Sequence, residues 1–290
     1  MSEDDDRLIP PGEQQSAIAI PSNEERAEVS ELQNDEEVKR RIRSMTRRSF
    51  VVAGAAAAAA AGSWTWLQTR AHVDQTPWPF RRALEANERL SQAWFRTSRL
   101  SPTFPASEAV RNVRVNGLIG LDRNVNVSDW KIRLEGSPGG PVDIGLNEIR
   151  SLKKREMVTE LRCIEGWSLI AHWSGARLSD LMARYPPPNR DGSRGDLRHP
   201  ERLVRYVSME TPGHQYYVGL DMESALHPQT LLAYELNNSP LSWDHGSPVR
   251  LAIPVKYGIK NIKRIAIIRY SDVRPADFWG ERGYDWYAGH

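Results

Sequence analysis

The chemistry that this 290-residue chain could perform centres on its single cysteine, Cys163. The thiol ends an alternating, strand-like stretch, Met157–Cys163, and a turn-prone segment, Ile164–Ser168, follows it. A lone cysteine in a strand is most often a small buried hydrophobic residue. Its neighbours here include Arg162 and Glu165, however, and a thiolate in polar surroundings can act as a nucleophile or as a metal ligand.

A nucleophilic cysteine needs a histidine close to it in space to accept its proton. The chain offers five candidates, none at a spacing typical of a protease or a transferase: His172, His199, His214, His227 and His245. Each of them could equally be an ordinary surface or hydrogen-bonded histidine. A cysteine hydrolase therefore stays open as an alternative, and it predicts that alkylating agents label the thiol.

Composition excludes several other kinds of site. One cysteine cannot form an intramolecular disulfide, a four-cysteine zinc site or a cysteine-held iron–sulfur cluster. A Cys-x-x-Cys-His motif is absent, so we expect no haem. A net charge of +2 offers no case for nucleic-acid binding. An apolar share of 40% and a mean hydropathy of −0.57 exclude a multi-span membrane protein and a wholly disordered one.

Charge is distributed unevenly at the N-terminus. Residues 1–37 hold twelve acidic and two basic residues, residues 39–48 hold six bases and no acid, and residues 49–69 hold no charge. The acidic stretch is polar, contains proline and lacks apolar periodicity, which is typical of disorder. We therefore interpret residues 1–44 as a disordered acidic and basic tail.

The segment that follows has the parts of an export signal. Met45–Phe50 contains paired arginines, and an alanine-rich apolar core follows it, extended by Trp64 and Trp66. This pattern resembles a twin-arginine signal, although an alanine-rich soluble helix is the alternative. We predict that residues 45–72 are a twin-arginine signal or a membrane anchor. The basic flank would keep the tail in the cytoplasm and place the rest in the periplasm, where it could stay anchored to the inner membrane.

The remaining residues, 75–290, are enough for one well-buried core. Apolar residues at helical spacing predict an amphipathic helix over residues 81–98. Further along, strand patterns dominate, at 125–134, 157–163, 203–209, 216–220, 231–236, 249–254 and 262–270, with short helices at 146–153, 178–185 and 222–226. The pattern lacks βαβ alternation, a phosphate-binding loop and a Gly-x-Gly-x-x-Gly motif. We therefore predict an α+β domain with a mixed sheet.

Four ordered segments of this region resemble the molybdopterin-binding domain of the sulfite oxidase family. They are Leu161–Ser168 (LRCIEGWS), His227–Leu232 (HPQTLL), His245–Pro254 (HGSPVRLAIP) and Lys256–Lys260 (KYGIK). The similarity runs from about residue 81 to the end of the chain and is greatest to the single-domain, twin-arginine-exported branch of periplasmic methionine-sulfoxide reductases. It implies a molybdenum–molybdopterin cofactor with one pyranopterin, and Cys163 as the thiolate ligand of molybdenum.

The resemblance also implies which other residues bind the cofactor. Arg250 and Lys260 match residues that bind its phosphate and pterin, and Gly258 and Ile259 would offer backbone groups at close approach. Three further residues match cofactor-binding positions of the family: Asn87 in the predicted helix, Thr211 after a predicted strand, and His245. The activity implied is an oxygen-atom transfer between water and a substrate.

Departures from the family pattern bear on the substrate. Sulfite oxidases place a Gly-Asn-Arg type of sequence after the ligand cysteine, whereas Glu165 and Trp167 stand here, and an acid there would repel sulfite. His245, in contrast, is sulfite-oxidase-like. Reduction of a small or protein-bound S- or N-oxide is therefore favoured. The alternatives are a sulfite dehydrogenase and a non-catalytic, membrane-anchored binding module. The aromatic tail, residues 275–286, is predicted to fold over the domain or over the mouth of the pocket.

Length bears on the partners. The folded part has no room for the immunoglobulin-like dimerisation domain or the cytochrome b5 domain of sulfite oxidases. We therefore expect a monomeric catalytic domain that exchanges electrons with a separate membrane or soluble cytochrome, contacts the membrane through its N-terminal segment, and binds no nucleic acid.

Overall fold

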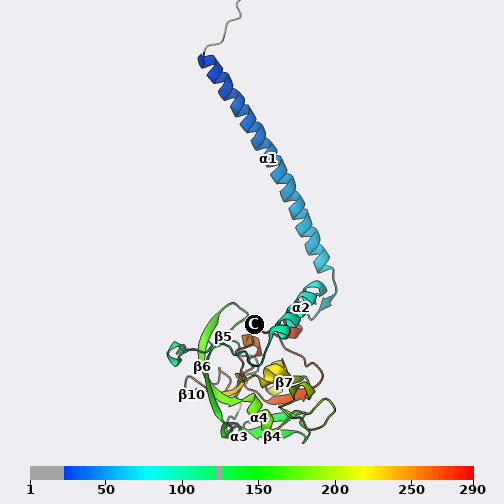
Figure 1. Ribbon diagram of the computed structural model, residues 1–290, viewed down its shortest axis with the longest axis vertical. Helices are drawn as coiled ribbons and strands as arrows, with labels where there is room; N and C mark the ends of the chain where they lie inside the picture. Colours follow the sequence, from blue (N-terminus) through cyan, green and yellow to red (C-terminus); the bar gives the residue numbers. More distant parts are fainter. Residues whose placement is uncertain (1–22, 122–125) are drawn as a thin grey trace, which may run out of the picture. The chain divides into compact units, whose positions relative to one another are not determined.

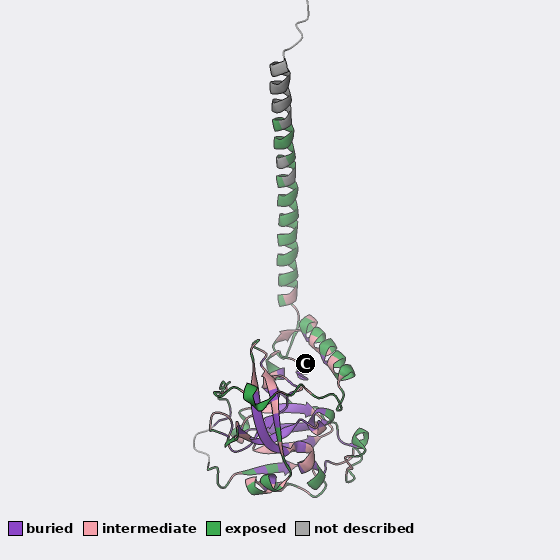
Figure 2. Ribbon diagram, turned by 60° about the vertical axis from the view of Figure 1, so that its left-hand side comes forward, coloured by how far each residue is buried: buried purple, intermediate pink, exposed green. Residues whose placement is uncertain are grey.

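The computed structural model describes residues 23–121 and 126–290, which divide into two units, Met1–Thr69 and Arg70–His290. In the first unit a single long helix, α1, covers Asn23–Gln68, and its described side chains are exposed almost throughout (Figures 1 and 2). By length and composition its portion Asp35–Gln68 could cross a membrane, since its most apolar window has a hydropathy of 1.4.

The helix begins earlier than the sequence predicts. Residues 23–44 were expected to belong to a disordered tail, yet they are helical, while residues 1–22 lie outside the described part. No proline or glycine interrupts residues 23–53, and the acidic and basic residues there are good helix formers. An i,i+4 ion pair joins Asp35 to Lys39 at 3.7 Å.

The second unit contains two five-stranded sheets and a two-stranded hairpin, β1 (His72–Val73) with β2 (Thr76–Pro77). The first sheet is antiparallel, in the order β10-β9-β6-β5, and β11 also pairs with β9. Its strands are β5 (Lys154–Arg162), β6 (Ser168–Arg177), β9 (Leu231–Leu236), β10 (Ser239–Pro240) and β11 (Arg250–Ala252).

The second large sheet has the order β4-β3-β12-β7-β8 and is mixed, because β12 pairs with β3 in parallel and the other pairs are antiparallel. Its strands are β3 (Lys131–Glu135), β4 (Val142–Gly145), β7 (Tyr206–Glu210), β8 (Tyr217–Asp221) and β12 (Ile267–Ser271). The α+β prediction with a mixed sheet is confirmed.

Four helices accompany the sheets within the described part of this unit: α2 (Trp78–Trp94), α3 (Leu146–Ser151), α4 (Leu178–Arg184) and α5 (Met222–Leu226). In Figure 1, α2 lies at one end of the folded unit, and α3 and α4 lie at the other. α5 and β9 coincide with their predicted ranges. The strand predicted from residue 125 is shorter and starts at Lys131, and residues 122–125 lie outside the described part.

Apolar side chains fill the space within and between the two sheets (purple in Figure 2). The larger cluster joins Ile132 of β3 and Met209 of β7 to Leu178 of α4 and Leu251 of β11, all of them at 1% exposure or less. A smaller cluster packs on β5, β6 and β9. Every described side chain that is buried lies in Arg70–His290, so this unit holds a complete core of its own.

Candidate active site

Cys163 lies immediately after β5, in the tight turn that leads into β6. Its backbone N–H donates to Trp167 O at 2.9 Å, and Gly166 N–H donates back to Cys163 O at 3.1 Å. Gly166 has a φ of +86°, which a residue with a side chain rarely adopts. The turn therefore fixes the thiol at the end of a nine-residue strand, as the sequence predicts, and the residue is only 5% exposed.

The thiol faces a cavity of about 340 Å³, to which several aromatic residues contribute. Its aromatic lining consists of Trp167, Trp173, Tyr216, Trp279 and Tyr284. The other side chains that matter for its chemistry are Asn116, Arg114, Arg250, Asn261 and Lys263. Asn116 Nδ2 donates to Cys163 Sγ at 3.4 Å, so the sulfur is oriented by a neutral amide. The aromatic tail does cover this region, because Trp279 and Tyr284 both belong to it.

Arg250 and Lys263 bring positive charge to this cavity without a carboxylate partner among the described residues. The guanidinium of Arg250 donates only to carbonyl oxygens, Asn261 O at 3.0 Å and His245 O at 3.2 Å among them, and stacks 4.8 Å from the Trp173 ring. Burial lowers the pKa of Arg250 to about 10. Lys263 Nζ likewise donates to the carbonyls of Gly117 and Asp244, each at 2.8 Å.

Two neighbouring buried lysines differ from this pair because each contacts an acid. Lys256 Nζ lies 3.4 Å from Asp221, and Lys260 Nζ lies 2.5 Å from Asp277. Lys260 also donates to Gly219 O at 2.8 Å. The described cavity lining thus contains two cations that form no ion pair, although Asp244 lies close enough to Lys263 to raise its pKa against the effect of burial, whereas the paired lysines do not line the cavity.

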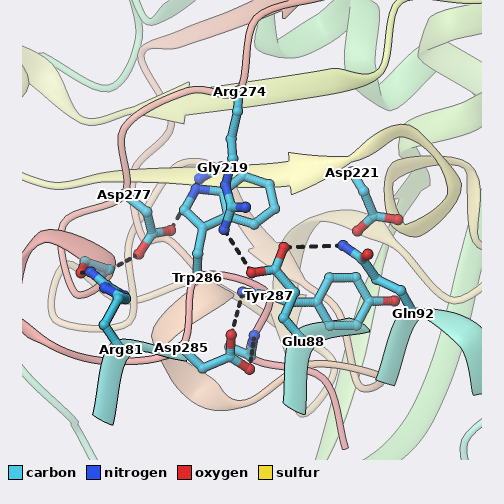
Figure 3. Close-up of polar contacts among 12 residues, drawn as sticks. Arg81, Glu88, Gln92, Gly219, Asp221, Arg274, Asp277, Asp285, Trp286 and Tyr287 are labelled. Atoms are coloured by element: carbon cyan, nitrogen blue, oxygen red, sulfur yellow. Dashed lines mark hydrogen bonds and ion pairs between the residues drawn. The ribbon is translucent and has the colours of Figure 1, made fainter. Parts of the chain in front are cut away.

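The structure places the side chain of Lys260, which the sequence predicts to bind the cofactor, outside this cavity. Its ammonium is fully buried, faces the C-terminal segment and stacks 4.6 Å from the Trp286 ring, and it does not line the cavity. Figure 3 shows Asp277 and Trp286 in that region. Lys263, three residues further on, is the lysine that lines the cavity. It is a residue that sequence reasoning missed, because it stands just outside the Lys256–Lys260 segment that carries the resemblance.

Gly258 and Ile259 line the cavity as predicted. A Cβ atom on Gly258 would lie 3.3 Å from Arg162 O and 3.8 Å from Cys163 Cα, so glycine permits the close approach of this loop to the thiol. The hydroxyl of Tyr216 donates to Ile259 O at 2.5 Å and holds the loop in place.

Three further predicted side chains do not line the cavity. Asn87 is exposed on α2, and the structure brings it nowhere near the lining. Thr211 is buried, and its hydroxyl accepts from Tyr216 N–H at 2.9 Å, so it positions a residue of the lining. His245 contributes its backbone carbonyl to Arg250, and burial lowers the pKa of its imidazole.

A second cavity, of about 280 Å³, borders the other face of β5. Side chains alternate along a strand, and accordingly Leu161 and Cys163 line the first cavity while Glu160 and Arg162 line the second. Arg162 Nε donates to Glu160 at 2.8 Å. The second cavity extends to Trp94 at the end of α2.

The environment of Lys263 predicts how stability depends on pH. Burial, together with Arg250, lowers its pKa from 10.5 to about 7. Between these values the unfolded chain binds more protons than the folded one, so the free energy of unfolding of the cofactor-free protein should rise with pH from about 7 toward 10.5. Below pH 7 the full cost of charging this partly buried ammonium is present. Urea unfolding at a series of pH values measures this slope.

Lys263→Met supplies the control for that measurement. Lys256 also has a pKa lowered to about 7 by burial and contributes a slope of the same sign, but it remains in the variant. The difference between the two proteins therefore isolates Lys263. Parallel curves across the whole range would contradict the assignment.

Comparison with known proteins shows which sequences and structures this chain is similar to. The sequence profile of the oxidoreductase molybdopterin binding domain matches residues 120–279. The protein-methionine-sulfoxide reductase catalytic subunit MsrP of Xanthomonas campestris is 35% identical over 162 residues, which are 54% of this chain and 49% of that protein. The putative protein-methionine-sulfoxide reductase subunit YedZ1 of Azospira oryzae is 30% identical over 201 residues, 68% of this chain and 71% of that protein.

Among solved structures, the sulfane dehydrogenase SoxCD from Paracoccus pantotrophus aligns with a TM-score of 0.44 and 16% identity, covering 52% of this chain and 40% of that one. The matched region spans about half the length of the MsrP relative.

Proposed function

Because the chain belongs to the oxidoreductase molybdopterin-binding domain family, of the sulfite oxidase type that its sequence predicts, we propose that it is a molybdenum–molybdopterin-dependent oxidoreductase. Its reaction would be an oxygen-atom transfer, in the direction of reduction of an S- or N-oxide that is small or protein-bound. Cys163 would be the protein ligand of molybdenum. Similarity to two methionine-sulfoxide reductase subunits supports this direction.

One observation carries the proposal: a buried thiol shares one cavity with two cations that form no ion pair among the described residues. A soft thiolate suits a redox-active transition metal, and the phosphate of a pyranopterin needs guanidinium, ammonium or backbone N–H donors. Arg250 and Lys263 are such donors, and carbonyl contacts alone do not neutralise them. The residues present therefore fit the cofactor that the family implies.

Each residue of the lining then has a definable task. Arg250 and Lys263 would bind the phosphate, and the backbone at Gly258 would approach the pterin closely. Asn116 would hold the sulfur of Cys163 in one orientation through its 3.4 Å hydrogen bond. When bound, the molybdenum cofactor supplies two-electron redox chemistry coupled to oxygen-atom transfer.

The side chains at the mouth of the cavity favour the binding of an uncharged, partly apolar substrate. Trp167, Trp279 and Tyr284 offer aromatic surface for a thioether-like group, and Glu165 would repel a dianion such as sulfite. The indole N–H of Trp167 donates to Glu165 at 2.9 Å, so the acid is fixed beside the opening. Arg114, stacked 4.7 Å from the Trp167 ring, favours the second candidate, a sulfite dehydrogenase, because it adds a cation to the same mouth.

Reduction of a sulfoxide consumes two electrons and two protons and releases water, so the proposed reaction needs an electron donor. We assign this role to a separate membrane or soluble cytochrome. Export by a twin-arginine-like route and anchoring through α1 would place the domain in the periplasm, beside such a donor. The apolar, charge-free stretch of α1 and its basic flank support this location.

The decisive experiment produces the full chain in a host that synthesises molybdopterin and measures bound metal and turnover. We expect equimolar molybdenum and dye-linked reduction of methionine sulfoxide that exceeds oxidation of sulfite. Turnover of sulfite alone would establish the second candidate. Natively exported protein without molybdenum, and without a visible charge-transfer band, would instead indicate a binding module.

A further inference from the structure

Helix α2 contacts the rest of its unit through its polar side. Its two buried residues are charged: Arg81 donates to Gly280 O at 2.9 Å, and Glu88 pairs with Arg274 at 2.8 Å. Gln92, one turn after Glu88, donates to the same carboxylate at 3.1 Å. Figure 3 shows these side chains directed from α2 toward the C-terminal segment that contains Trp286. The contacts that hold the helix are therefore hydrogen bonds and ion pairs.

The apolar side of α2 is left uncovered as a consequence. Phe80, Leu90 and Trp94 are 49%, 53% and 69% exposed. At 3.6 residues per turn they fall within about 80° of one another on the helix surface. Ala83 and Asn87, both exposed, lie between them on the same stripe. We call these five residues the α2 stripe. A helix normally buries such a stripe against its own core, so its exposure points to contact outside the chain.

The polar face of the helix carries basic residues. Arg82, Arg89 and Arg96 are exposed and lie together on the helix and its C-terminal extension, about 140° round the axis from the centre of the stripe. Only Arg82 has an acidic partner within ion-pair distance among the described residues, Glu85 at 3.5 Å, and both side chains are largely exposed. An apolar stripe with aromatic side chains, together with arginines on the polar face, is the pattern of a helix that lies in the plane of an anionic lipid surface.

The chain itself supplies the reason for a lipid surface in preference to a soluble partner. The apolar part of α1 ends at Gln68 and α2 begins at Trp78. Ten residues can span at most about 35 Å, so a membrane-inserted α1 would keep α2 close to the bilayer. Tethering raises the effective concentration of a weak binding face, so a short stripe is sufficient.

We propose that the α2 stripe docks on the surface of the membrane in which α1 is anchored, with Leu90 and Trp94 at the acyl boundary and the arginines at anionic headgroups. This contact would hold the end of the second cavity, at Trp94, next to the bilayer. The inference rests on the proposed anchoring by α1 and is independent of the cofactor and of the substrate.

The test uses the full chain reconstituted in vesicles of phosphatidylcholine and phosphatidylglycerol with brominated acyl chains, which quench tryptophan fluorescence on contact. We expect the quenched part of the emission to fall in Trp94→Phe. It should be unchanged in Trp130→Phe, a tryptophan packed against the main core. Trp64 and Trp66 of α1 contribute equally to both variants and cancel in the comparison.

Charge is tested separately, with Arg82→Gln combined with Arg89→Gln. Each arginine near an anionic surface contributes about 1 kcal/mol, so the double variant should reduce binding of the Arg70–His290 unit to phosphatidylglycerol-containing vesicles by more than about tenfold. These side chains are exposed, and the melting temperature should therefore not change.

Two results would overturn the proposal. One is equal quenching in the wild type and Trp94→Phe. The other is self-association of the Arg70–His290 unit in sedimentation equilibrium that Trp94→Asn abolishes, because the stripe would then cover a second copy of the chain. Both results can be measured on protein without molybdenum. They can therefore be distinguished from a failure of the proposed enzyme activity.

Discussion

Replacing Cys163 with serine is expected to remove molybdenum from the purified protein and to abolish turnover. Changes in outer-shell partners of a metal already reduce affinity or activity by about 10- to 100-fold, so loss of the direct protein ligand should exceed about a hundredfold. Serine is nearly isosteric, and the residue lies in a turn held by its own backbone bonds to Trp167 and Gly166. The fold should therefore persist, and metal analysis together with near-ultraviolet circular dichroism checks both statements.

Asn116 supplies a graded comparison for that experiment. Its amide contacts the same sulfur at 3.4 Å, so Asn116→Ala should reduce molybdenum content or turnover by no more than the outer-shell range. Alkylation distinguishes a metal ligand from the remaining alternative, the nucleophile of a cysteine hydrolase. A metal-bound thiolate should resist iodoacetamide, whereas a hydrolase nucleophile should react. Full metal content in Cys163→Ser would contradict the assignment of the ligand.

The sequence predicts strands well where apolar residues dominate a short segment. β9 and β7 appear at or near their expected ranges, although nearly all of their residues are buried. β6 escaped prediction because its buried stretch, residues 171–176, includes His172, Ser174 and Gly175, which interrupt the apolar pattern. Its Gly175 is required there, since a Cβ would lie 2.2 Å from Leu232 O of the neighbouring strand. Pairing of this kind depends on tertiary packing that local pattern does not encode.

Helix α2 shows a different limit of prediction. Its 3.6-residue periodicity was read correctly as a helix, but the periodicity does not say which side faces the protein. Arg81 and Glu88 are buried, since Gly280 O and Arg274 are available to them, and Leu90 remains exposed. Asn87, expected to bind the cofactor, lies on the exposed side for the same reason.

The candidate site likewise combines residues that the local sequence indicates with residues that only tertiary folding brings there. Cys163, Gly258 and Arg250, which the sequence assigns to the cofactor site, line one cavity and stand in short segments whose backbone geometry the sequence restricts. Which of Lys260 and Lys263 keeps a free charge depends on Asp277, the ion-pair partner of Lys260. Asp277 lies seventeen residues further along the chain, and no local motif reveals the pairing. Lys263 and the tail aromatics Trp279 and Tyr284 reach the cavity only through tertiary folding.

The two lysines should respond oppositely to replacement by methionine. Lys260→Met leaves the buried carboxylate of Asp277 without its counter-charge, and breaking a buried ion pair from one side typically costs about 3–5 kcal/mol. Backbone N–H groups of Gly219 and Gly280 still donate to Asp277, which places the expected loss in the free energy of unfolding near the lower end of that range. Urea unfolding of the cofactor-free protein measures it.

Lys263→Met should leave the cofactor-free protein as stable as the wild type or more stable, because it removes a partly buried cation whose hydrogen-bond partners are all carbonyls. Its expected defect is retention of the pterin and molybdenum after purification. Adding Asp277→Asn to Lys260→Met removes the orphaned charge and should restore part of the lost stability, a non-additivity that a merely disrupted core would not show. Normal stability with lost cofactor in Lys260→Met would return the phosphate-binding role to Lys260. If Lys260→Met loses stability and Lys263→Met loses only the cofactor, Lys260 serves the fold and Lys263 serves the cofactor. Of the two ammonium groups, only that of Lys263 forms no ion pair within the described part of the chain, so only its charge remains for a phosphate to neutralise.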